Sequence, residues 1–211
     1  MGLIGRAAAS ALALAALMLV IVCGTMEIAM RKALRAKGPP LASRTEISFR
    51  VDDSFTAAER AAILKSFRRI GQVSGCVGLK ASFERIGLGE ILSWRKDRHA
   101  TIHRASDPTT WRYRTARRLV GSGSYMGVAM ITTGDVFIMA SFEDDHDDFE
   151  NTVTHEVLHV VFRDGWHSKD PDSLMYHSIG GGGQRFLAAE AARLRTLCAL
   201  AKPPAGGDKP R

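Results

Sequence analysis

An alternation of apolar and polar side chains marks the start of the folded part of the chain. Every second residue over 47–51 is apolar, which is the period of a half-buried strand. A capping box formed by Thr56 and Glu59 then predicts a helix that ends at Gly75. A second strand is expected over 78–83, and this strand–helix–strand order predicts a parallel pair. The expected apolar face of the helix contains Ile63, Leu64, Phe67 and Ile70.

The second half of the chain shows a hairpin and two helices. Two β-rich runs, 126–132 and 136–142, flank a turn with glycine and predict an antiparallel hairpin. The acidic segment 143–150 precedes an apolar-rich helix over 149–162, where its charge would favour the helix N-terminus. Calcium binding by this segment is the less favoured interpretation. A closing helix is expected over 186–200.

The stretch 84–124 has no clear periodicity and is rich in arginine and tryptophan. Basic residues among aromatic ones can bind single-stranded nucleic acid. Because charge runs usually face water, we favour a solvated, loop-rich insertion pinned to the core by its tryptophans. His99 and His103 share helical spacing but have no further ligand nearby, so they are predicted to be surface histidines.

The two ends of the chain are expected to lie outside the fold. Residues 1–24 predict an export signal peptide or a membrane anchor, because an almost unbroken apolar run follows Arg6. A linker is expected over 25–45 and a disordered tail over 202–211. The folded domain is then 46–201, and it is expected to be periplasmic, secreted, or anchored to a membrane outside the cytoplasm.

Composition limits the class of protein without identifying its function. With 45% hydrophobic and 24% charged residues in 211, one globular domain is expected, and disordered or collagen-like classes are excluded. The net charge of +7 is compatible with an anionic membrane surface; no nucleic-acid partner is expected, and the domain is predicted to be a monomer. Cys76 and Cys198 either form a disulfide or remain two independent thiols.

The strongest chemical signal is the sequence HEVLH at 155–159, which contains HExxH. On a helix, His155 and His159 project from one face and can both bind one zinc ion, with Glu156 beside the open coordination position. A catalytic zinc site usually has three protein ligands and a water. His167 is the natural third ligand, since it follows a turn at Gly165 that could bring the chain back to the helix; the alternatives are Asp164, His177 and Glu190.

The run HSKDPDSLMY over 167–176 resembles the segment of matrixin metalloproteases that begins with the third zinc histidine and ends in the Met-turn. Together with HEVLH, it resembles the metzincin clan. Carried over by position, the zinc ligands match His155, His159 and His167, the general base matches Glu156, and the turn methionine matches Met175.

Two features depart from this family pattern. His167 lies two residues further from the helix than HExxHxxGxxH requires, and His177 stands where matrixins have proline after the Met-Tyr pair. The longer spacing means either that the helix runs further before turning or that the third ligand is another residue.

The resemblance implies an α+β fold of the zincin or metzincin type. A twisted mixed sheet would pack on a long active-site helix, and a C-terminal helix after the Met-turn would pack under the sheet. An edge strand would bind the substrate main chain antiparallel, and by chain order this strand matches 126–132. The predicted substrate-binding residues are therefore Gly127, Val128 and Ala129.

These observations predict a zinc-dependent metalloendopeptidase with one catalytic zinc ion and a peptide or protein as substrate. Hydrolysis would use a zinc-bound water, with Glu156 as the general base. One alternative is a gluzincin-type peptidase in which Glu190 is the third ligand. Another is a non-catalytic, zinc-stabilised binding module on a membrane anchor.

Overall fold

The computed structural model describes residues 46–87, 100–121, 125–131, 133–177 and 185–201. The predicted signal or anchor, the linker and the tail lie outside these ranges. In the described part, no helix has the length and apolar character needed to cross a bilayer. The described elements are β1 (Glu46–Asp52), α2 (Ala57–Ser74), β2 (Gly78–Glu84), β3 (Ala100–Arg104), α4 (Trp111–Val120), β4 (Gly127–Met130), β5 (Asp135–Ile138), α5 (His146–Phe162) and α6 (Ala188–Ala201).

Five strands form one mixed sheet in the order β2-β1-β3-β5-β4. The pairs β1–β2, β1–β3 and β3–β5 are parallel, so the predicted parallel pair is confirmed. The hairpin β4–β5 is antiparallel, as predicted, although both of its strands are shorter than expected. Strand β4 lies at one edge of the sheet, which agrees with the expected place of the substrate-binding strand.

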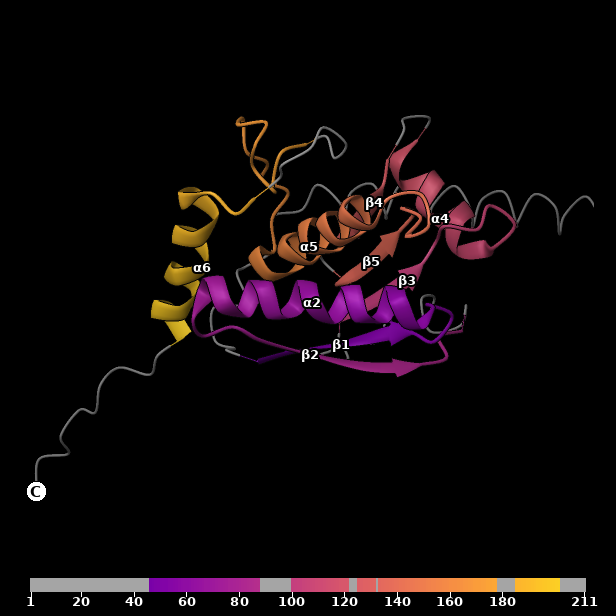
Figure 1. Ribbon diagram of the computed structural model, residues 1–211, viewed down its shortest axis with the longest axis horizontal. Coiled ribbons are helices and arrows are strands. Elements are labelled where there is room, and N and C mark those ends of the chain that lie inside the picture. Colours follow the sequence, from indigo (N-terminus) through magenta and orange to yellow (C-terminus); the bar gives the residue numbers. More distant parts are fainter. Residues whose placement is uncertain (1–45, 88–99, 122–124, 132, 178–184, 202–211) are drawn as a thin grey trace, which may run out of the picture.

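Helices α2 and α5 pack side by side on one face of the sheet (Figure 1). The capping box of Thr56 and Glu59 begins α2, and Gly75 ends it with a φ of 73°, as the sequence predicts. The buried face of α2 includes Ile63, Phe67 and Ile70, but the side chain of Leu64 is 36% exposed. The prediction was therefore wrong in assigning Leu64 to the buried face of α2.

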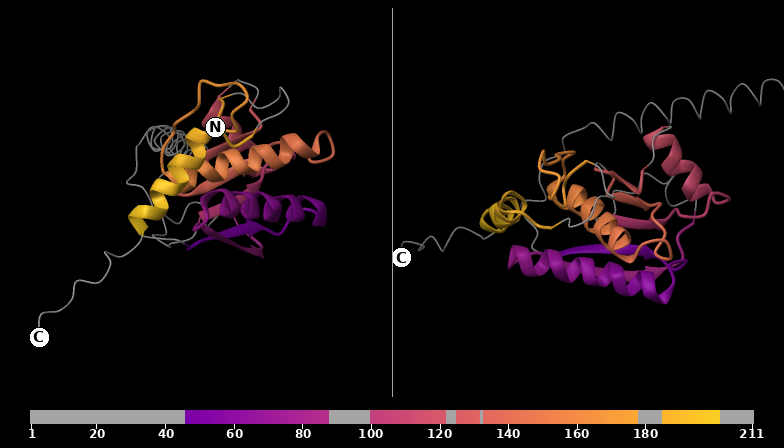
Figure 2. Two further views of the ribbon diagram at one scale, coloured as in Figure 1. Left: turned by 60° about the vertical axis from the view of Figure 1, so that its left-hand side comes forward. Right: turned by 45° about the horizontal axis from the view of Figure 1, so that its top comes forward.

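Helix α4 covers the opposite face of the sheet at β4 and β5 (Figure 2). Side chains alternate along these strands, so Ala129 and Val136 belong to the main core while Val128 and Phe137 pack with Ala116 of α4. The loop-rich interpretation of 84–124 was thus wrong for 100–120, which contains β3 and α4. Trp111 packs against the second cluster, as the pinning role of the tryptophans requires, whereas Trp94 and His99 lie outside the described residues.

Helix α6 lies across the ends of α2 and α5 and contacts α2 (Figure 1). A disulfide joins Cys198 of α6 to Cys76, just after the C-terminus of α2, so one of the two interpretations of these cysteines is confirmed. The expectation that this helix packs under the sheet was wrong. It contacts α2 instead, and its buried Leu194 belongs to the core between the sheet and helices α2 and α5.

Candidate metal centre

The helix that carries the HExxH sequence begins with the acidic segment. Asp145 is its N-cap and accepts hydrogen bonds from the backbone N–H groups of Asp147, at 2.8 Å, and Asp148, at 2.9 Å. These carboxylates lie at the positive end of the helix dipole, as predicted. Among the described residues, the histidines described next are the one group of His, Cys, Asp or Glu side chains that could hold a metal ion.

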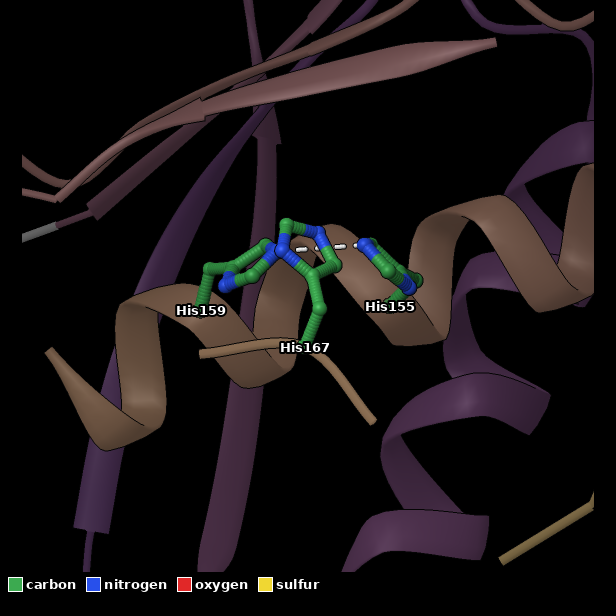
Figure 3. Close-up of side chains that lie close together, drawn as sticks. All are labelled: His155, His159 and His167. Carbon is green, nitrogen blue, oxygen red and sulfur yellow. Dashed lines mark hydrogen bonds between the residues drawn. The ribbon is translucent and has the colours of Figure 1, made fainter. Parts of the chain in front are cut away.

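Three histidines converge beside the middle of α5 (Figure 3). His155 and His159 project from adjacent turns of the helix, and His167 approaches from the segment that follows it. One ring nitrogen from each lies within 4.8 Å of the other two. The predicted ligand set is therefore brought together, with His155 and His159 buried and His167 exposed.

Backbone carbonyls fix the tautomers of the two helix histidines. Nδ1 of His155 lies 2.8 Å from the carbonyl oxygen of Leu174, and Nδ1 of His159 lies 2.9 Å from that of Asp164. A carbonyl oxygen can only accept, so both Nδ1 atoms carry the proton and both Nε2 atoms present lone pairs. These two Nε2 atoms are 3.1 Å apart. The two lone pairs would repel each other at this distance. A metal cation that accepts both lone pairs would remove this repulsion.

Burial keeps these rings neutral. It lowers the pKa of His155 to about 4, and together with the charges of the other two histidines it lowers that of His159 to about 3. Burial and the neighbouring His177 also lower the pKa of His167. Neutral imidazole is the form that binds zinc, so the donor set is ready for a metal at neutral pH.

Glu156 lies between the helix and the edge strand. Its side chain is buried, and burial raises its pKa to about 8, while a hydrogen bond from the backbone of Ala129 acts in the opposite direction. A Cβ atom at Gly127 would lie 2.7 Å from Cγ of Glu156, so glycine is needed for β4 to approach the helix this closely.

The outer edge of β4 presents backbone groups at alternate residues. The carbonyl of Met130 accepts a hydrogen bond from Gly134 N–H within the hairpin. The backbone of Ala129 instead hydrogen-bonds to Glu156, on the side of β4 away from β5. The backbone groups of Gly127 and Ala129 therefore point away from β5, whereas those of Val128 point toward Phe137 of β5. Substrate binding by Gly127, Val128 and Ala129 stays a prediction.

Helix α5 runs to Phe162 and turns at Arg163, which adopts a left-handed conformation with φ of 51° and ψ of 38°. Arg163 lies four residues after His159, one more than the glycine in HExxHxxGxxH, and three residues rather than two separate it from His167, so one of the two extra residues precedes the turn and the other follows it. The left-handed turn was expected at Gly165, but Gly165 is not among the residues with positive φ.

The predicted Met-turn is joined to the metal centre by backbone carbonyl groups. Met175 is fully buried in the core, and its carbonyl accepts a hydrogen bond from Ser168 N–H at 2.7 Å. The adjacent Leu174 supplies the carbonyl that holds His155. This loop therefore supports both a ligand of the helix and the segment that begins with His167.

Glu190, the alternative third ligand, does not join the cluster. It is fully buried, accepts a hydrogen bond from the Ser173 hydroxyl, and accepts another from Leu187 N–H at 2.8 Å. Its two carboxylate oxygens are thus engaged away from the histidines. The gluzincin-type arrangement does not fit these contacts.

His103 was wrongly predicted to lie on the surface. It is fully buried on β3, where Nε2 lies 3.2 Å from Oδ1 of Asp135 and the ring stacks on Phe137. His103 faces α4, on the side of the sheet opposite the metal centre, since Phe137 belongs to that cluster.

No protein-family model matches the chain, and no curated protein sequence matches it. Among solved structures, the chain is similar to the crystal structure of archaemetzincin from Methanopyrus kandleri. The two share 11% sequence identity with a TM-score of 0.48, over 76% of this chain and 98% of that chain. The function of this chain therefore has to be inferred from the geometry of its own site.

Proposed function

We propose that the domain is a zinc-dependent metalloendopeptidase of the metzincin type. The observation that carries this proposal is the convergence of three histidine nitrogens beside the buried carboxyl group of Glu156. Structural zinc sites are usually closed by four protein ligands, whereas catalytic sites keep one position open. Exposure of His167 leaves one side of the cluster accessible, as a catalytic site requires.

The chain supplies the groups that peptide hydrolysis needs. A bound zinc ion would contribute Lewis acidity toward the peptide carbonyl and a more acidic water. Glu156 would accept a proton on its carboxylate as a water oxygen bonds to the peptide carbonyl carbon, and it would donate that proton to the amide nitrogen as the C–N bond breaks. Burial raises the pKa of Glu156 to about 8 in the metal-free chain, whereas the hydrogen bond from the Ala129 backbone and the positive charge of a bound zinc ion would both favour the ionised carboxylate that this role requires.

The edge strand would orient the substrate. The outward backbone groups of Gly127 and Ala129 lie next to Glu156, so a peptide paired antiparallel with β4 would place its main chain beside the metal centre. Main-chain pairing is insensitive to side-chain identity, which suits a substrate that is an extended segment of peptide or protein.

Cleavage of an unfolded protein by the purified full-length chain tests this function. We expect cleavage that a zinc chelator abolishes, and a Glu156→Gln variant that retains one zinc per chain while its kcat falls by about 10²–10⁴-fold. Asp147→Asn removes an exposed carboxylate from the same helix and serves as the matched control. Glu156→Gln cleaving at the wild-type rate would refute the assignment. Zinc binding without any cleavage would favour the non-catalytic binding module.

We also propose that the domain works outside the cytoplasm. The disulfide between Cys76 and Cys198 supports this location, because such bonds persist in oxidising compartments. Export of the full-length chain, measured by fractionation, would test it, and retention in the cytosol with both thiols reduced would contradict it.

A further inference from the structure

Helix α6 touches both segments that hold the helix histidines. Leu174 and Asp164 provide the carbonyl oxygens that accept from Nδ1 of His155 and His159. Two charged residues of α6, Glu190 and Arg193, contact these segments. They lie three residues apart and therefore occupy neighbouring positions on the surface of the helix.

Glu190 secures the segment around Leu174. Its buried carboxylate accepts from the Ser173 hydroxyl, and that same hydroxyl oxygen accepts from Met175 N–H at 3.0 Å. Leu174 lies between Ser173 and Met175, so the hydrogen bonds of these neighbours fix the position of its carbonyl. The carbonyl is then held at 2.8 Å from His155.

Arg193 secures the turn that contains Asp164. Its guanidinium pairs with the Asp164 carboxylate and lies 4.7 Å from the ring centroid of Phe162 and 4.6 Å from that of Trp166. The other carboxylate oxygen of Asp164 accepts from Trp166 N–H at 3.2 Å. These contacts hold the Asp164 carbonyl at 2.9 Å from His159.

We propose that Glu190 and Arg193 are positioning residues for the metal centre, which they support from α6 through the carbonyls of Leu174 and Asp164. The inference rests on the proposed metal site, but not on peptide hydrolysis. A carbonyl that accepts from Nδ1–H orients the ring and strengthens the Nε2 donor, and loss of such partners typically weakens metal binding 10–100-fold. Neither residue touches the ion itself.

Cobalt(II) binding by the full-length chain tests this role without any measurement of turnover. Glu190→Gln keeps the shape of the side chain but removes one of its acceptor oxygens, and Arg193→Met keeps much of the apolar contact but removes the ion pair. Arg195→Met is the control, because Arg195 is exposed on the same helix. Affinity is measured by competition with a chelator, together with the visible absorption of bound cobalt and thermal unfolding of the metal-free protein.

We expect cobalt affinity to fall 10–100-fold in Glu190→Gln and Arg193→Met, with a changed cobalt spectrum, and to stay at the wild-type level in Arg195→Met. If a variant fails to fold, Arg193→Lys, which keeps the charge but loses the planar fork, gives the comparison, and a smaller loss is expected. Wild-type affinity and spectrum in folded variants of lowered thermal stability would overturn the proposal, because α6 would then act only on folding.

Discussion

At the scale of single residues, burial controls the protonation of the metal centre. The pKa of His155 is lowered to about 4 and that of His159 to about 3, so both rings remain neutral well below the ordinary histidine value of 6.5. Protons therefore compete with the metal only at low pH. We expect zinc affinity, measured with a competing chelator, to change little between pH 7.5 and about 5. A tenfold loss of affinity per histidine for each pH unit below 6.5 would contradict this.

The stability of the metal-free protein should depend on pH in a related way. Between about pH 4.5 and 6.5, the unfolded chain protonates His155 and His159 while the native state does not, so acidification destabilises the fold. The native state keeps a proton on Glu156 up to about pH 8, whereas the unfolded carboxyl ionises near 4.5, so a rise in pH also destabilises it. Two histidines outweigh one carboxyl below pH 6.5, and only the carboxyl acts above it.

Stability of the metal-free protein is therefore expected to peak near pH 6.5. Urea denaturation in the presence of a chelator should show a loss of about 1 kcal/mol per pH unit above pH 6.5, where one net proton is involved, and a loss at least as steep below it, because the pKa of His167 is lowered as well. Glu156→Gln should remove the decline between pH 6.5 and 8 and steepen the decline below 6.5. An unchanged profile in this variant would mean that Glu156 is ionised in the native protein.

Gly127 limits the distance between β4 and α5. A Cβ atom there would approach Thr152 Cγ2 to 2.8 Å and Glu156 Cγ to 2.7 Å. We expect Gly127→Ala to cost about 1–3 kcal/mol in the free energy of unfolding, measured with urea, and to displace the Glu156 carboxylate. Gly87→Ala is the control, because no atom of the described residues lies within 4 Å of its added carbon. Equal stability in both variants would show that β4 can move away without cost.

Sequence reasoning identified His155, Glu156 and His159 because their spacing along one helix is itself the chemical signal, and it proposed His167 because that residue follows a turn after the helix. It missed the roles of Ser173 and Arg193, whose partners lie 17 and 29 residues away. Such contacts leave no periodic trace in a single sequence. His103 was placed on the surface because its partner, Asp135, is brought to it only by the parallel pairing of β3 and β5.

At the scale of elements, the sequence predicted the segments with a clear apolar pattern and did not predict the arginine-rich helix. The capping box of α2 and the alternation of β1 reflect local hydrogen bonds and burial, so the sequence shows both. Helix α4 buries only Ala116 and Leu119, and with so many arginines around them these two residues give no recognisable helical periodicity. Two end signals were nevertheless present, since Thr110 is its N-cap and Gly121 its C-cap.

The end of α5 offers a test of this local reasoning. Arg163 adopts a left-handed conformation that glycine accepts without a steric penalty. We expect Arg163→Gly to raise the free energy of unfolding by about 0.5–1 kcal/mol relative to Arg163→Ala, measured with urea, because both variants lack the side chain but only glycine relieves the strain. Equal stability of the two would indicate that the turn relaxes when alanine replaces arginine.

At the scale of the whole molecule, the metal centre lies where three parts of the fold meet. Helix α5 contains two of the predicted ligands, the loop after it contains the third together with a carbonyl that holds His155, and α6 contacts that loop. The disulfide ties α6 back to the end of α2. The ligands are close in sequence, but their support depends on the closure of the entire chain.

The disulfide should therefore contribute both to stability and to the metal centre. Cys76 and Cys198 are 122 residues apart, and a crosslink over a loop of that length is expected to stabilise the fold by about 4–5 kcal/mol through the entropy of the unfolded chain. A Cys76→Ser, Cys198→Ser double variant should lose about that much stability in urea when a chelator is present. Zinc should restore part of it, because an ion that binds only the native state shifts the equilibrium toward folding. If the double variant is equally stable in zinc and in the chelator, the three histidines do not form a metal site without the disulfide.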